Sequence, residues 1–163
     1  MKRLIIPLLC ISLNVLALEI YPLVSGKINM IKAVGSAIKQ GDLLVQIDDT
    51  EAKLELDYLL ALQRIHQQNL DDKQLELQQT KELYERLVAS YRDLEIIQLA
   101  FNRAKQEMDA HNAKIKIVEH KLSQYQIHAP TDGTIKALPN RRNVTNIHAP
   151  KVLMVIEQSD KEN

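Results

Sequence analysis

Few side chains in this chain could carry out covalent chemistry. Its 163 residues include one cysteine, Cys10, and five histidines. A disulfide framework needs at least two cysteines and a cysteine-rich zinc site needs more, so the sequence excludes both. No nucleophile–base pair, pair of catalytic carboxylates or glycine-rich phosphate loop can be placed on it. We therefore predict that the protein is not an enzyme.

Two of the histidines, His66 and His111, could act together. They would lie opposite each other if the chain between them folds back on itself near Ala89. Such a pair could clip a metal ion, respond to mildly acidic pH, or form a polar layer that fixes the register of two helices. Zinc usually takes three or four protein ligands, and no third ligand is placed there. The sequence therefore predicts no metal site and favours the polar layer.

The overall charge and composition indicate long solvated helices. Lys+Arg and Asp+Glu number 21 each, so the basic excess of a nucleic-acid-binding protein is absent. Aromatic residues make up only 4%, and there are four glycines and five prolines. A compact domain of this length normally uses more turn-forming and bulky core residues.

A region without glycine or proline runs from Glu51 to Leu122. Its second half carries an apolar seam in steps of three and four, typical of a helix that packs on a partner helix. Ser90 followed by Asp93 fits a capping box, which would start a new helix. We predict an antiparallel, coiled-coil α-helical hairpin over residues 51–123 with its tip near 87–90. Leucines off the seam are either surface residues or a second stripe that packs on neighbouring copies or a partner.

The segments on either side of this region are typical of β structure. Apolar residues alternate there and are punctuated by glycine, as in strands joined by tight turns. Neither segment alone has enough strands to bury a core. We predict that residues 18–50 and 124–157 are two halves of one β domain, followed by a tail at 158–163.

The N-terminus indicates export. Lys2 and Arg3 precede a short apolar run that ends near Ala17. This pattern fits a secretory signal over residues 1–17, and the run is short for a membrane span. The alternative is an uncleaved N-terminal anchor. Either reading predicts a periplasmic protein associated with the inner membrane.

Two motifs resemble the membrane-fusion, or periplasmic adaptor, family of the HlyD type. The first is Gly35-x-x-Ile38-x-x-Gly41-x-x-Leu44-x-x-Ile47-Asp48, and the second is Ala129-Pro130-x-Asp132-Gly133-x-Ile135. The resemblance implies an α+β fold, namely a lipoyl/biotinyl-like β-sandwich split by a long antiparallel helical hairpin. It also implies a short form of the family without the β-barrel and membrane-proximal domains. The position at which lipoyl domains carry a cofactor lysine reads Asp48-Asp49-Thr50, so no cofactor is expected.

The same resemblance implies a function in transport. Family members link an inner-membrane transporter to an outer-membrane channel by packing as homo-oligomers or mixed assemblies, and act in efflux or secretion. The implied partner-docking residues at the hairpin tip are Leu83, Arg86, Leu87, Ser90 and Asp93. Gln79 stands where the family often has arginine, and Leu87 where glycine is frequent. The alternative is a stand-alone periplasmic interaction or regulatory protein, or a truncated accessory adaptor without a transport role of its own.

Overall fold

The computed structural model describes residues 17–138 and 146–158 of the chain. The predicted signal, except Ala17, and all but the first residue of the predicted tail lie outside them. The described chain is α+β, as the sequence predicts, with two helices and two four-stranded sheets. It divides into two compact units. Asp48–Gln126 form one unit, and the residues before and after this stretch form the other.

The two sheets are built from strands on both sides of the helical region. One sheet has the order β1-β8-β6-β3 and the other β5-β4-β2-β7. The strands of the first are β1 (Ala17–Ile20), β8 (Met154–Gln158), β6 (Gly133–Ala137) and β3 (Ala37–Ile38). Those of the second are β5 (Gln126–His128), β4 (Leu43–Ile47), β2 (Gly26–Ile31) and β7 (Asn146–Ile147). Each sheet therefore combines strands from both flanking segments, and in the first sheet the two strands that follow the helices, β8 and β6, lie between the two that precede them.

Buried apolar side chains of these strands form the core of this unit. In β8, Met154 and Ile156 are fully buried, whereas the residues that follow each of them are partly exposed. This is the two-residue period of a strand that has one buried face. Leu44, Val45 and Ile47 of β4 and Ile135 of β6 complete the fully buried set of large strand residues. Both flanking segments thus contribute to one core.

Several element limits differ from the predicted ones. The predicted cleavage point after Ala17 falls inside β1, in which Ala17 pairs with Glu157 of β8. Thr50, assigned to the β region, is the first residue of a helix. Gln158, assigned to the tail, is the last residue of β8. Pairing with distant strands sets the limits of β1 and β8, and the local sequence gives little indication of that pairing.

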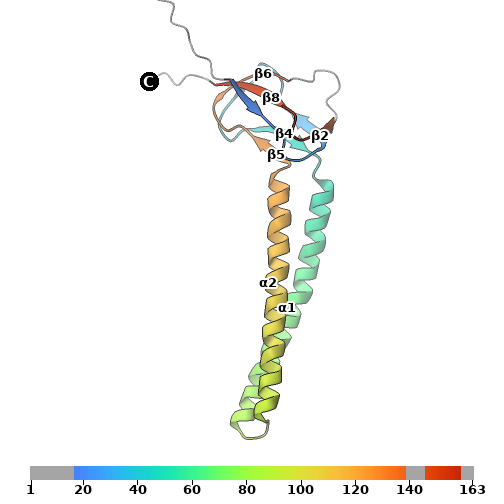
Figure 1. The fold of residues 1–163 in the computed structure, drawn as a ribbon, viewed down its shortest axis with the longest axis vertical. Helices are drawn as coiled ribbons and strands as arrows, with labels where there is room; N and C mark the ends of the chain where they lie inside the picture. The colour runs from blue at the N-terminus through green and yellow to red at the C-terminus, as the bar shows by residue number, and fades with distance from the viewer. Residues whose placement is uncertain (1–16, 139–145, 159–163) are drawn as a thin grey trace, which may run out of the picture. The chain divides into compact units, whose positions relative to one another are not determined.

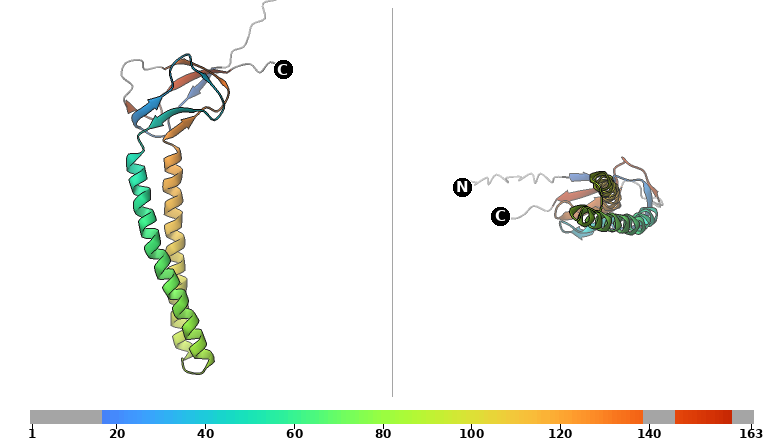
Figure 2. Two further views of the ribbon diagram at one scale, coloured as in Figure 1. Left: turned by 180° about the vertical axis from the view of Figure 1, so that it is seen from behind. Right: turned by 90° about the horizontal axis from the view of Figure 1, so that it is seen from below.

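Two long helices form the second unit. They are α1 (Thr50–Glu85) and α2 (Tyr91–Ser123), with 36 and 33 residues. At 1.5 Å per residue they span roughly 54 and 50 Å. Lys121 Nζ lies 3.1 Å from Glu55 Oε2, and Gln63 Nε2 lies 2.8 Å from Asn112 Oδ1, so the helices run antiparallel. Figures 1 and 2 show them side by side along their length.

The contact between the helices follows the predicted apolar seam on α2. The buried residues of α2 are spaced by four, three, four and three positions: Ala104, Met108, His111, Ile115 and Val118. On α1 only Ala52 is buried, because polar residues interrupt the apolar positions that face α2. Within the described residues, neither helix has an apolar stretch long enough to cross a bilayer.

Candidate docking site

The turn that joins α1 to α2 ends the first helix in an unusual way. The Leu87 N–H donates to the Tyr84 carbonyl at 2.9 Å, and the Val88 N–H donates to the Leu83 carbonyl at 2.9 Å. These two bonds define a Schellman motif, whose left-handed residue is usually glycine. Here it is Leu87, with φ 62°, the only non-glycine residue with positive φ in the described chain. A side chain therefore occupies a position that normally has none.

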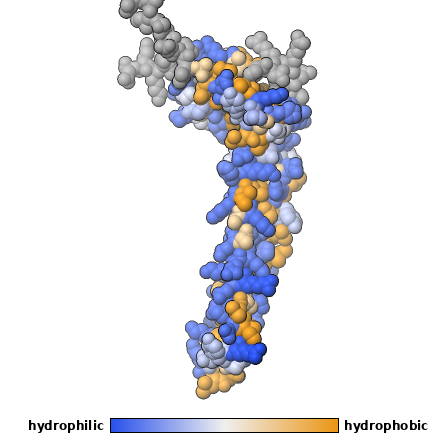
Figure 3. All heavy atoms as spheres, in the orientation of Figure 1, coloured by the Kyte–Doolittle hydropathy of each residue, from blue (hydrophilic) through white to orange (hydrophobic). Residues whose placement is uncertain are grey.

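Apolar side chains are exposed around this turn. The exposed fraction is 93% for Leu87 and 72% for Val88. Leu83, Tyr84 and Tyr91 are also exposed, and the two tyrosine rings meet edge to face with centroids 6.4 Å apart. Figure 3 shows apolar surface at the free end of the helices. We call residues 83–93 the tip.

The start of α2 confirms the predicted capping box. The Asp93 N–H donates to Ser90 Oγ at 3.2 Å, and the Ser90 N–H donates to Asp93 Oδ2 at 2.9 Å. The Ser90 hydroxyl also donates to Asp93 Oδ2 at 2.6 Å. This hydroxyl bond, then the backbone bond, holds the pKa of Asp93 below its usual value. The box fixes the direction in which α2 leaves the turn.

The tip contains all the predicted docking residues. Leu83 lies in the last turn of α1, Leu87 in the connecting turn, and Asp93 in the first turn of α2. Ser90 and Asp93 are bonded to each other, so their polar atoms serve the cap. Arg86 is exposed at the C-cap of α1 and has no ion pair among the described residues. Exposed apolar side chains and the Arg86 cation are thus available to a partner.

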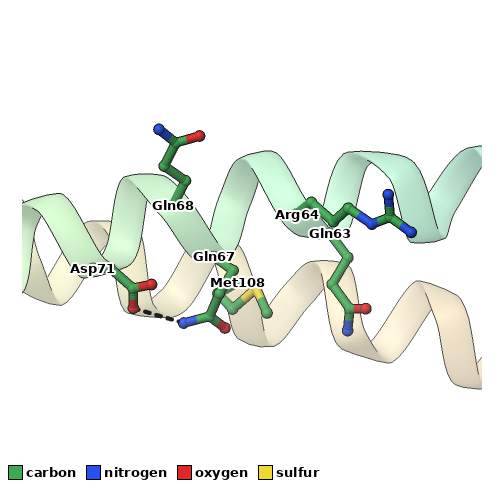
Figure 4. Close-up of a pocket in the computed structure, with 6 residues that line it drawn as sticks. All are labelled: Gln63, Arg64, Gln67, Gln68, Asp71 and Met108. Carbon is green, nitrogen blue, oxygen red and sulfur yellow. Dashed lines mark hydrogen bonds between the residues drawn. The ribbon is translucent and has the colours of Figure 1, made fainter.

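Two shallow grooves lie along the helices. One, of about 440 Å³, is next to the tip and is lined by Leu77, Lys81, Tyr91, Leu94, Glu95, Gln98 and Leu99. The other, of about 500 Å³, lies further along and is lined mainly by residues with polar or charged end groups (Figure 4). There Gln67 Nε2 donates to Asp71 Oδ1 at 2.8 Å, and Met108 is the only apolar lining residue. Neither groove brings together groups with evident catalytic roles.

The structure brings the two seam histidines into contact. The ring centroids of His66 and His111 are 4.8 Å apart, with the planes tilted by 39°. His111 is only 5% exposed, and its Nε2 lies 2.8 Å from the Leu59 carbonyl oxygen. Because a carbonyl can only accept, Nε2 carries the hydrogen. No group of three or more His, Cys, Asp or Glu side chains within the described residues could hold a metal ion.

The predicted β signature residues connect the two flanking segments. The Gly41 N–H donates to the Ala129 carbonyl, and the Ala129 N–H donates to the Asp42 carbonyl, both at 2.8 Å. Asp132 Oδ1 accepts the Gln40 N–H at 2.7 Å. The two motifs thus hydrogen-bond to each other.

The remaining signature residues have local roles. Gly35 and Gly41 both have φ 87°, which glycine adopts without strain. Gly133 begins β6. Asp48 Oδ1 accepts hydrogen bonds from the Thr50 N–H and hydroxyl at the start of α1, and Pro130 is exposed next to the paired Ala129.

Sequence reasoning missed the ion pairs of this unit, Lys136 with Glu157 and Lys32 with Asp42. Lys32 Nζ lies 2.7 Å from Asp42 Oδ2, and this hydrogen bond, then that from the Lys39 N–H, lowers the pKa of Asp42. The pair joins the end of one strand segment to a turn ten residues later. No local sequence signal marks such a contact.

The fold is that of the membrane fusion, or periplasmic adaptor, proteins. MacA from Actinobacillus actinomycetemcomitans is 25% identical and superposes with a TM-score of 0.56 over 87% of this chain and 48% of its own. The membrane fusion protein Spr0693 from Streptococcus pneumoniae R6 is 14% identical, with a TM-score of 0.64 over 88% and 63%.

A third solved structure is the periplasmic adaptor protein EmrA, which is 15% identical with a TM-score of 0.52 over 87% and 72%. This chain spans less than half the length of MacA, and 40% of a Bacteroides eggerthii efflux transporter of the same fold. No family profile and no curated protein matches the sequence.

Proposed function

We propose that this chain is a periplasmic adaptor subunit of a secretion or efflux assembly. In this proposal the two sheets are a lipoyl-like sandwich, split by a coiled-coil helical hairpin, and residues 1–17 direct export. The chain links an inner-membrane transporter to an outer-membrane channel without covalent chemistry. The fold it shares with MacA, Spr0693 and EmrA supports the proposal.

The observation that carries the proposal is the apolar tip. A helical pair with a closed polar turn would need no leucine, valine or tyrosine exposed at its end, and contiguous exposed apolar side chains mark interaction sites. Here five such side chains lie within nine residues: Leu83, Tyr84, Leu87, Val88 and Tyr91. We assign them, with Arg86, to docking on the channel.

The sides of the helical pair supply surface for packing between copies. Tyr58 and Ile65 on α1 and Ile117 on α2 are each about two-thirds exposed. Side-by-side packing of several chains would remove these side chains from water, at roughly 25 cal/mol per Å² of apolar area. Oligomerisation would also multiply a weak contact at each tip.

Site-specific photo-crosslinking in cells of the native host tests this function. A photoreactive residue replaces Val88 at the tip or, as a matched control, Ile65 on the side of α1. We expect the Val88 position to crosslink to an outer-membrane channel protein, and the Ile65 position to crosslink to a second copy of the chain or a related adaptor. The proteins crosslinked at each position are identified by mass spectrometry.

The result that refutes the adaptor function is a tip that crosslinks to no envelope transport protein while the labelled chain is exported and folded. A tip that crosslinks only to a full-length adaptor would instead support an accessory role. A tip that crosslinks only to a soluble periplasmic protein would support a regulatory one.

A further inference from the structure

We infer that the channel receives the tip in an apolar socket, and that Leu87 is the side chain that fills this socket. The inference rests on the proposed function and adds the chemistry of the contact. Leu87 is both strained and almost fully exposed, and either property alone disfavours a leucine there.

The strain comes from the backbone. At φ 62° the Cβ of an L-residue approaches the following carbonyl, and glycine avoids this clash because it has no Cβ. The Schellman hydrogen bonds of Leu87 and Val88 use only backbone atoms, so they form equally well with glycine. Residues held in such conformations cluster at sites of function. The backbone conformation and hydrogen bonds of the turn therefore do not explain why residue 87 is a leucine.

Burial within the chain does not explain the leucine either. With 93% of the residue in water, the Leu87 side chain gains almost nothing from burial within its own chain. Val88, 72% exposed, extends the same apolar surface. The favourable burial that the leucine can supply must come from a surface outside the described chain, and that surface must be apolar.

The charges around the tip favour a protein socket over a lipid surface. Residues 81–95 hold three basic and four acidic side chains, so an anionic bilayer would not attract them. The charged residues are Lys81, Glu82, Glu85, Arg86, Arg92, Asp93 and Glu95. The exposed apolar side chains of the tip are not accompanied by a polybasic patch, the kind of second signal that stable membrane anchoring requires. A contact between two tips would bury too little area for a stable dimer. A socket with an apolar floor and a rim of mixed charge fits the tip.

Substitutions at position 87 separate the side chain from the backbone. Leu87→Gly removes the side chain and the strain, whereas Leu87→Met keeps an apolar side chain in the strained conformation. Leu54→Ala, on α1 far from the tip, is the control for loss of an exposed apolar group. The probe is the purified channel protein identified by crosslinking, titrated onto the immobilised full chain.

We expect Leu87→Gly to weaken binding at least about tenfold, a loss typical of a central interface residue. Its thermal midpoint should stay the same or rise by a few degrees. Leu87→Met should bind within about threefold of the unsubstituted chain. Leu54→Ala should bind like the unsubstituted chain. A variant that is more stable yet binds less tightly cannot be explained by misfolding.

Other results overturn the inference. If the unsubstituted chain binds the channel and Leu87→Gly binds equally well, the socket is wrong but the adaptor function stands. If the unsubstituted chain binds no channel, the proposed function fails, and the inference with it. Co-flotation with phosphatidylethanolamine–phosphatidylglycerol vesicles, or concentration-dependent dimerisation, would overturn the protein socket if Leu87→Gly abolishes it. The first result assigns the tip to lipid and the second to a second copy.

Discussion

Gly133→Ala tests the packing of the β unit at one atom. A Cβ built on Gly133 would lie 2.3 Å from the carbonyl oxygen of Glu157 and 3.0 Å from Ile156 Cγ2. Gly133 pairs with Gln158 and its neighbour Thr134 with Glu157, so the colliding oxygen belongs to the paired strand β8. It cannot move away unless β6 and β8 separate. The clash should therefore destabilise the sheet directly.

The magnitude follows from the kind of neighbour. Overpacking a core typically costs about 1–3 kcal/mol when side chains can rearrange. Here a backbone oxygen is involved, so we expect a loss of about 3 kcal/mol or more in the free energy of unfolding. Gly35→Ala is the matched control because no atom lies within 4 Å of its added Cβ. It should cost only the left-handed strain, about 1–2 kcal/mol.

The assay must report on the β unit separately from the helices. Urea unfolding followed by hydrogen–deuterium exchange of peptides from residues 127–138 and 152–158 does this, because helical circular dichroism would mask the change. Gly133→Ala should shift the midpoint to lower urea by more than Gly35→Ala does. An equal or smaller shift for Gly133→Ala would show that β6 and β8 are not as close as the structure has them.

Three further predictions concern the tip, acid stability and the polar layer. Ser90→Ala should lower the stability of α2 by about 1 kcal/mol, read from helical circular dichroism in urea, and no change would contradict the capping box. Asp42 has a lowered pKa, so its stabilising effect is complete above its unfolded pKa near 4 and is lost as pH falls through the folded value. Asp42→Asn should therefore destabilise the chain at pH 7 and have little effect at pH 2 in thermal unfolding. Replacing both His66 and His111 by leucine should raise the thermal midpoint of the helices while loosening their register, and crosslinks between cysteine pairs would measure the register.

The features that the sequence predicted well are those set by neighbours along the chain. The capping box depends on Ser90 and Asp93, three residues apart, and the α2 seam depends on a period that is visible in the residue order. The conformation of Leu87 could not be predicted in this way. Leucine carries no preference for positive φ, and the Schellman bonds form only once both helices have fixed directions. A strained residue is the place where local preference and final structure disagree.

The β unit shows the other limit of prediction. Glycine spacing indicated turns at Gly35 and Gly41, and both have positive φ. The order β1-β8-β6-β3 could not be derived, because β3 has only two residues and its partner lies almost a hundred positions away. The irregular register between β2 and β4 likewise has no sequence signal. Long-range pairing chooses among several alternatives that the local pattern permits.

Because each sheet combines strands from before and after the helices, the helical segment also affects the stability of the β unit. Both sheets need strands from before and after residues 48–126, so the β core cannot form until the ends of this segment meet. Closing a flexible loop of roughly 80 residues costs on the order of 4 kcal/mol in chain entropy. The antiparallel helices remove most of this cost, because Glu55 near the start of α1 and Lys121 near the end of α2 already form an ion pair.

The polar groups at the seam, Gln63 with Asn112 and His66 with His111, can be satisfied together in only one register. These polar residues weaken the apolar seam of α1. We infer that they also align the two helix ends from which the β strands continue.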